Sequence, residues 1–169
     1  MADADHCIFT PADLRAILPD LSASAFKTLL SRAASAGYLQ RLCRGLYLYE
    51  KAASDSGLLL FHVAARLRAE CLNYISLETV LSDAGVISQM PINRIFVMSS
   101  GRSSVVSCGR WGTIEFVRTR QTPQELVGQI YYDSRCKLWR ASVAQALRDM
   151  RATHRSTELV DWSVVDELV

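Results

Sequence analysis

Hydrophobic and polar positions near the start of the chain predict a short first helix. Thr10 can cap its N-terminus, Pro11 suits its first turn, and Asp13 can complete a capping box. Pro19 ends the helix, because a proline interrupts the hydrogen-bonding pattern of a helix. The spacing places three residues on its predicted apolar face: Leu14, Ile17 and Leu18.

A second helix is predicted directly after this turn. Ser22 can cap it, and Gly37 is typical of the position that follows a helix C-terminus. Its predicted buried face follows i, i+3, i+4, i+7 spacing and consists of Phe26, Leu29, Leu30 and Ala33. A polar face with the same spacing carries Ser24, Lys27, Thr28 and Ser31, with Arg32 on its border.

A two-stranded hairpin is predicted after Gly37. Its strands cover residues 38–42 and 46–49, and its turn covers residues 43–45. From Ser22 to Tyr49 the chain holds four basic residues and no acidic one. The order of helix, tight turn, helix and basic hairpin predicts a winged helix-turn-helix, a fold that places one helix in a DNA groove and the hairpin beside it.

A small polar segment, residues 51–56, is the predicted boundary between two domains. We expect a winged helix-turn-helix domain over residues 1–52 and a second domain over residues 53–169. The predicted fold class is α+β, and the C-terminal domain is expected to combine a small antiparallel sheet with helices.

The pattern in the second domain also predicts its elements. Helices are expected over residues 57–70 and 76–83. Three strands joined by hairpin turns follow at residues 94–99, 103–108 and 113–118. The end of the chain is predicted to be helical, with one helix beginning at Thr122, another over residues 137–153 and a last one after Asp161.

The composition is that of an ordinary globular protein. Hydrophobic residues make up 50% and charged residues 21%, and the net charge is +2, so a nucleic-acid surface must come from local segregation of charge. The five cysteines are scattered without a CxxC pair, which predicts neither a zinc site nor a disulfide framework and fits a reducing cytoplasm. No signal peptide or membrane-spanning run is visible. We expect a soluble cytoplasmic protein without metal or cofactor.

The polar helix face and the hairpin carry the candidate DNA contacts. Lysine and arginine can reach phosphates or guanine edges, and short hydroxyls let a helix lie close to the bases. Arginines at a hairpin turn can meet phosphates or enter the minor groove. A solvated helix face and a soluble sheet edge are the alternative interpretations. The candidate residues are Ser22, Ser24, Lys27, Thr28, Ser31, Arg32, Gln40, Arg41 and Arg44.

A second group of arginines lies between Val86 and Arg120, where five arginines, the first of them Arg94, accompany the single acid Glu115. The other four arginines have two interpretations: they form a second phosphate-contacting surface, or they keep a solvent-facing sheet edge soluble. These residues are Arg102, Arg110, Arg118 and Arg120. Trp111 is either a partner anchor or a partly buried structural residue.

Sequence motifs of catalysis are missing. The chain contains no GxxxxGK[ST], GxSxG or HExxH motif and no paired-carboxylate motif, so we expect no enzyme. His62 lies in an apolar segment, where a core histidine is expected rather than a general base. Cys43 stands beside Arg44, which could lower the pKa of its thiol, but one such thiol is weak evidence for a redox or catalytic role.

Two segments of the chain resemble a known family. The stretch FTPADL…LLSRAASAGYLQRLCRGLYLY contains the pattern A-x-x-G-Y-L-x-R-x-x-R-G-L-Y from Ala34 to Tyr47. It is similar to the N-terminal domain of AbiEi-type antitoxins, the transcriptional regulators of bacterial type IV toxin–antitoxin systems. The segment from Asn73 to Glu78, with Gly85, Gln89-Met90-Pro91 and Gly101 after it, is similar to the start of their C-terminal domain. The resemblance extends to about Arg120.

This resemblance implies a sequence-specific repressor that acts as an antitoxin and regulates its own operon by binding inverted repeats in double-stranded DNA. It implies two copies of the chain on the operator, as a homodimer, and a nucleotidyltransferase-like toxin as the candidate protein partner. By position, the recognition-helix role falls on Ser24, Lys27, Thr28, Ser31 and Arg32, and the wing role falls on Arg41 and Arg44.

The chain departs from this family before Thr10. Members usually carry a further helix there, whereas nine residues precede Thr10 in this sequence. We expect either a trimmed helix-turn-helix or a structure in which the helix over residues 57–70 takes that packing position. Two other functions stay open: a protein–protein adaptor whose winged helix binds a partner, and an accessory DNA-binding protein of a mobile element.

Overall fold

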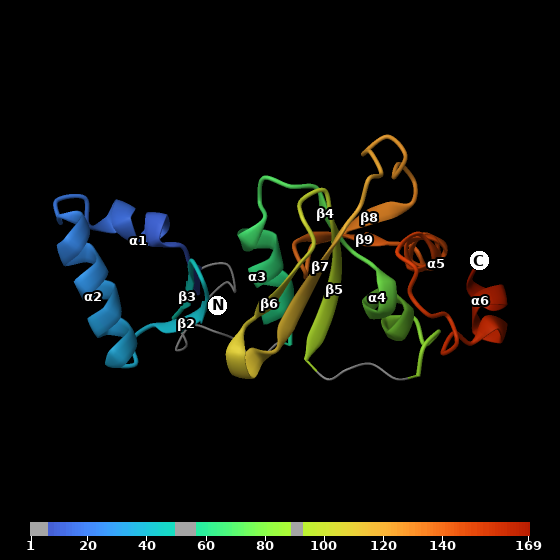
Figure 1. The fold of residues 1–169 in the computed structure, drawn as a ribbon, viewed down its shortest axis with the longest axis horizontal. Coiled ribbons are helices and arrows are strands. Elements are labelled where there is room, and N and C mark those ends of the chain that lie inside the picture. Colours follow the sequence, from blue (N-terminus) through green and yellow to red (C-terminus); the bar gives the residue numbers. More distant parts are fainter. Residues whose placement is uncertain (1–6, 50–56, 89–92) are drawn as a thin grey trace. The chain divides into compact units, whose positions relative to one another are not determined.

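The computed structural model describes residues 7–49, 57–88 and 93–169, and these residues form two compact units, Met1–Gly57 and Leu58–Val169 (Figure 1). They contain six α-helices and two β-sheets, a mixed α/β architecture. The predicted boundary segment 51–56 and the Gln89-Met90-Pro91 motif lie outside the described residues. Where the chain is described, no helix combines the length and the apolar character needed to cross a lipid bilayer.

The first unit is a small three-stranded sheet with two helices. All its strand pairs are antiparallel, and the strand order is β1-β3-β2. Its elements are β1 Ile8–Phe9, α1 Pro11–Ile17, α2 Ala23–Ser35, β2 Gln40–Cys43 and β3 Leu46–Leu48. The central strand β3 provides the core of the unit, because Leu46 and Leu48 are 1% and 0% exposed.

Both helices of this unit begin where the sequence predicts. Thr10 and Asp13 form the capping box of α1, and the Ser22 hydroxyl accepts a hydrogen bond from the N–H of Ala25 at the start of α2. The predicted apolar faces are partly wrong, however. Ile17 is 69% exposed and Leu29 is 42% exposed. A unit of this size has too small a core to cover every apolar side chain of its helices. Some residues of the predicted apolar faces therefore stay at the surface.

The second unit is built on one six-stranded sheet with the order β6-β7-β5-β4-β9-β8. Its strands are β4 Asn73–Ile75, β5 Arg94–Ser99, β6 Ser104–Ser107, β7 Thr113–Arg118, β8 Ile130–Asp133 and β9 Leu138–Ala141. Its helices are α3 Leu59–Leu67, α4 Leu77–Asp83, α5 Val143–Ala152 and α6 Trp162–Leu168, and a 3-10 turn covers Gly109–Trp111.

The sheet is mixed rather than antiparallel, which corrects the prediction from sequence. Strand β5 pairs with β7 in parallel, and β4 pairs with β9 in parallel. The segment at Gly101 is therefore no hairpin turn, because the chain passes from β5 to β6 on the far side of β7. Burial explains this order. Ile95 to Ser99 of β5 are all buried, so this strand suits the interior of the sheet with a strand on each side. Strand β6 is largely exposed and suits the edge of the sheet.

The predicted helices after Thr122 are also partly wrong. Thr122 and Glu125 make the expected hydrogen bonds at 2.6 and 2.9 Å, but they close only a turn. The segment expected to start a helix at Lys137 forms strand β9, and its partner β8 had not been predicted. Both strands are rich in aromatic and branched residues, which favour strands. The helix itself begins only after Ser142, whose hydroxyl accepts from the N–H of Gln145.

Two neighbouring residues of β4 show which helices cover each face of the sheet. The Asn73 side chain donates to the carbonyl oxygen of Arg68, at the end of α3, at 2.6 Å. The Tyr74 hydroxyl donates to Asp149 of α5 at 3.3 Å. Successive residues of a strand point to opposite faces, so α3 covers one face and α5 the other (Figure 1). Helix α4 packs against α5 and β5.

Helix α3 belongs to this sheet. It packs against β5, β7 and β9 through an apolar side that is buried in the second unit.

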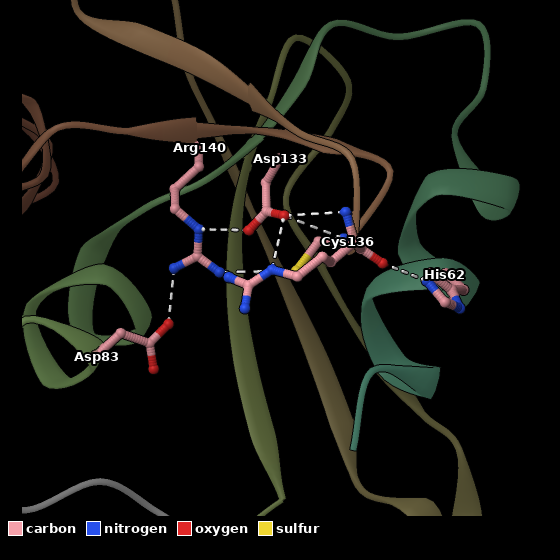
Figure 2. Close-up of polar contacts among 6 residues, drawn as sticks. His62, Asp83, Asp133, Cys136 and Arg140 are labelled. Carbon is pink, nitrogen blue, oxygen red and sulfur yellow. Dashed lines mark hydrogen bonds and ion pairs between the residues drawn. The ribbon is translucent and has the colours of Figure 1, made fainter. Parts of the chain in front are cut away.

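The β8–β9 turn carries a buried ion pair (Figure 2). Asp133 accepts a hydrogen bond from Arg140 Nε at 3.2 Å, and Arg140 Nη1 lies 2.6 Å from Asp83, at the end of α4. Burial opposes the charge on Arg140, but its hydrogen bonds and the charge of Asp83 outweigh this effect and raise its pKa. The pair therefore ties the β8–β9 hairpin to α4.

The same carboxylate orders the turn backbone (Figure 2). Asp133 Oδ1 accepts from the backbone N–H groups of Arg135 and Cys136 at 3.0 and 3.4 Å. Burial raises the pKa of Asp133, but these hydrogen bonds and the charge of Arg140 leave it below its usual value. His62 Nε2 lies 2.7 Å from the carbonyl oxygen of Arg135, which confirms a packed core histidine. Burial raises the pKa of the Cys136 thiol, although the hydrogen bond from Arg140 acts in the opposite direction.

Asp133→Ala should lower the free energy of unfolding by about 3–5 kcal/mol, because Arg140 is left buried without one of its carboxylates. Urea denaturation of the whole chain, followed by circular dichroism, measures this loss. Asp166→Ala removes an exposed carboxylate of α6 and should change the free energy by less than about 0.5 kcal/mol. Equal stability of the two variants would contradict a structural role for the pair.

Candidate functional site

Helix α2 presents a polar stripe to solvent. At about 100° per residue, the stripe covers roughly 140° of the helix circumference. Every member is exposed, and none of them is acidic: Ser24, Lys27, Thr28, Ser31 and Arg32. Lys27 and Arg32 make no ion pair with any described residue, so both cations remain available for an anionic partner.

Some hydroxyls of this surface already have partners. Thr28 Oγ1 donates to the carbonyl oxygen of Ser24 at 3.0 Å, and the hydroxyls of Ser22 and Ser24 lie 3.2 Å apart. Ser22 also caps the helix. The sequence prediction treated these residues as equivalent contacts, but the geometry separates them. Ser31 makes no side-chain hydrogen bond with the described residues and remains the most available hydroxyl.

Two buried side chains and one arginine hold α2 in place. Phe26 and Leu30 are the buried residues of the helix, at 7% and 9% exposure. Arg15 of α1 donates to the carbonyl oxygen of Ser22 at 3.3 Å, and its guanidinium lies 5.2 Å from the centre of the Phe26 ring. The arginine therefore fixes the turn between the two helices while its charge faces a ring.

The hairpin tip is short and cationic. Cys43 pairs with Leu46, so the loop consists of Arg44 and Gly45 alone. Gly45 has φ +85°, a conformation that glycine adopts without steric cost. Arg41 and Arg44 are both exposed, whereas the predicted contact Gln40 is only half-exposed. The two arginines make no ion pair with the part of the chain that is described.

The second group of arginines does not form one surface. Arg94 pairs with Glu115 at 3.9 Å and lies against the Phe96 ring. Arg110 precedes β7 and stacks on Trp111 at 4.8 Å, whereas Arg102 and Arg118 lie at the opposite end of the β6–β7 pair. Arg118 and Arg120 are exposed and the intervening Thr119 is buried, as alternation along an extended segment requires.

Trp111 is half-buried, and its indole Nε1 is buried without a hydrogen-bond partner among the residues that the structure describes. This geometry fits the structural interpretation of Trp111 better than an exposed partner anchor.

The end of β7 borders a cavity of about 590 Å³. Its walls include Arg118 and Arg120, together with Arg148 of α5 and His154 just beyond that helix. No pattern in the sequence points to Arg148 or His154, because their approach to Arg118 depends on the parallel pairing of β5 and β7 and on the position of α5.

A buried carboxyl group, Asp149, lies at this cavity and is 2% exposed. It accepts hydrogen bonds from Ser76 at 2.7 Å, Gln145 at 2.8 Å and Tyr74 at 3.3 Å. Burial raises the pKa of Asp149, although these hydrogen bonds and the charge of Arg148 act in the opposite direction. Burial and the charge of Asp149 likewise raise the pKa of Tyr74.

The described residues contain no group of three or more histidine, cysteine, aspartate or glutamate side chains that could hold a metal ion. The described cysteines form no disulfide, and Cys43 is half-buried with its sulfur 3.9 Å from the carbonyl oxygen of Arg44. The strongest chemical features of the chain are therefore its cationic surfaces and the cavity beside Asp149.

Comparisons with protein-family models, with curated proteins and with solved structures found no match for this chain.

The raised pKa of Asp149 predicts a pH-dependent stability difference between the wild type and Asp149→Asn. The folded state holds the proton more tightly than the unfolded state, whose aspartate pKa is about 3.9. The wild type should therefore lose stability relative to Asp149→Asn as the pH rises from that value through the folded-state pKa, and the difference should then level off. Urea denaturation at a series of pH values measures it. A stability difference between the two proteins that does not vary with pH would contradict a raised pKa of Asp149.

Proposed function

We propose that the chain is a sequence-specific DNA-binding repressor whose first unit is a winged helix-turn-helix. The observation that carries this proposal is the acid-free stripe on α2, where Lys27 and Arg32 are exposed and unpaired among the described residues. Cations at these positions can neutralise phosphates or read guanine edges, and Ser31 adds a hydroxyl that can contact bases or backbone.

The topology of the unit supports the same proposal. A tight turn joins α1 to α2, the β2–β3 hairpin follows, and β1 completes the sheet by pairing with β3. In such an arrangement the second helix would enter the major groove, and Arg41 and Arg44 would meet the adjacent backbone. The two-residue tip limits how far this wing can reach.

Charge segregation supports DNA as the partner despite the low net charge. The acids of residues 7–49 are Asp13 and Asp20, and Asp13 is engaged in the capping box of α1. The cations beyond Ser22 therefore have no nearby acidic partner in the described sequence. Such local potential steers a protein to the phosphate backbone.

The biological role within this proposal rests on the resemblance to AbiEi-type antitoxins. We propose that two copies bind inverted repeats upstream of a toxin–antitoxin operon and repress it. The partner gene would encode a nucleotidyltransferase-like toxin. An overlapping downstream gene of that kind is the genomic observation that tests this role.

A protein–protein adaptor is the second candidate, and exposed apolar side chains in the first unit favour it. Ile17 and Tyr38 are 69% and 64% exposed, and Leu18 and Leu29 are exposed as well. An adaptor would use this apolar surface, whereas the DNA-binding proposal requires the cationic stripe. A mobility shift with the DNA upstream of the gene separates the two.

Lys27→Glu with Arg32→Glu should abolish specific binding to that DNA, because two cations of the recognition helix become anions. Fluorescence anisotropy measures the affinity, and circular dichroism should show an unchanged fold, since both residues are exposed. The matched control, Arg66→Glu with Arg151→Glu, changes the net charge equally through exposed residues of the second unit. Retained affinity in the first variant, or an equal loss in the control, would exclude α2 as the recognition element.

Arg41→Ala with Arg44→Ala should flatten the salt dependence of DNA binding. Each lost phosphate contact lowers the slope of log K against log salt concentration by about 0.9, so the pair should remove about 1.8. Anisotropy titrations across a range of salt concentrations give the slope. An unchanged slope would mean that both arginines only keep the hairpin edge soluble.

A further inference from the structure

The cavity of about 590 Å³ in the second unit is a candidate ligand site that DNA binding does not use. Its walls come from the end of β7, the residues after it and the C-terminal half of α5. We infer that this cavity binds a phosphorylated small molecule of about nucleotide size. The inference is independent of the proposed DNA contacts, because every lining residue belongs to the second unit.

The arginine side chains of the cavity form no ion pair with an acid among the described residues. Arg118 and Arg120 are exposed and make no ion pair in the described parts of the chain. Arg148 donates to Gln145 Oε1 at 3.0 and 2.9 Å and also to Gln129. Both acceptors are neutral amide oxygens, so they hold the guanidinium in position without forming an ion pair, although its charge also acts on the neighbouring Asp149.

The two acidic residues of the cavity make hydrogen bonds within the protein, Glu125 through Oε2 and Asp149 through both carboxylate oxygens. Glu125 accepts from the N–H and the hydroxyl of Thr122 at 2.6 and 2.9 Å. Asp149 is surrounded by three donors, and it supports the floor of the cavity rather than its mouth. Three guanidiniums therefore dominate the charge that a ligand meets.

The floor also offers neutral donors. Gln121 Oε1 accepts from Gln145 Nε2 at 2.8 Å and lies 3.1 Å from the Tyr74 hydroxyl, whose single hydrogen it shares with Asp149. Because its carbonyl oxygen is occupied in this way, Gln121 has its amide hydrogens left to donate to a ligand. Met98 and Ala152 form an apolar part of the cavity wall, which suits an uncharged part of the ligand.

Shape and chemistry together select the ligand class. Cavities of about 300–1,000 Å³ hold small molecules, and arginine forks match the oxygens of a phosphate group in a bidentate manner. A duplex backbone needs an extended or protruding surface, whereas these arginines border a hollow. A ligand with a phosphate group at the arginines and an organic part over Met98 would match both the charge and the shape of the cavity.

Isothermal titration calorimetry of the full chain with AMP, ATP and ribose 5-phosphate tests the inference at constant ionic strength. Two matched probes each lack one part of the ligand: adenosine lacks the phosphate group, and inorganic phosphate lacks the organic part. We expect saturable binding of at least one phosphorylated compound, no binding of adenosine, and weaker binding of inorganic phosphate.

Arg118→Gln with Arg120→Gln should weaken this binding by at least about tenfold, because two charge-assisted hydrogen bonds are lost. Arg151→Gln removes an exposed arginine of α5 that does not line the cavity, and it should bind like the wild type. Both substitutions lie at the surface, and circular dichroism with thermal melting checks that each variant folds.

Four results would overturn the inference. They are no saturable binding of any phosphorylated compound, binding unchanged in the Arg118 and Arg120 variant, adenosine binding as tightly as AMP, and inorganic phosphate binding as tightly as the best organic phosphate. A DNA duplex that loses affinity in this variant while AMP does not bind would assign the arginines to backbone contact instead.

Discussion

The exposed cationic surface of the first unit depends on how little of α2 is buried. Phe26 and Leu30 are the buried side chains of the helix, and Arg15 holds its first turn through the Ser22 carbonyl and the Phe26 ring. This narrow attachment leaves the opposite side of the helix in solvent. Cations can stay unpaired there at little cost, because water solvates them until an anionic partner replaces the water.

The second unit uses the reverse arrangement, with polar groups placed inside the fold. Adjacent side chains of β4 connect α3 and α5 to opposite faces of the sheet, and the Asp133–Arg140 pair connects the β8–β9 hairpin to α4. Buried polar groups of this kind fix geometry because each one requires particular partners. Gln145 and Gln129 likewise hold Arg148 at the cavity, and Ser76, Gln145 and Tyr74 hold Asp149, so these two side chains are already in position for the ligand that we propose.

Local signals predicted the local structure well. The Thr10–Asp13 capping box, the Ser22 cap and the strands Arg94–Ser99 and Thr113–Arg118 need only neighbouring residues, and the structure has them. The exposure of Ile17 and Leu29 could not be predicted, since helical spacing does not reveal whether another element covers the face. The parallel pairing of β5 with β7 depends on contacts between distant segments, and so does the cavity that brings Arg148 near Arg118.

The central claim is that α2 and the hairpin tip are the DNA-facing surface of this chain. Backbone amide chemical shifts of the isotopically labelled full chain, recorded while the DNA upstream of its gene is added, test it most directly. The account predicts the largest changes along Ser24–Arg32 and at the tip around Arg44. Changes confined to the second unit, or centred on the apolar side chains of Ile17 and Tyr38, would contradict it.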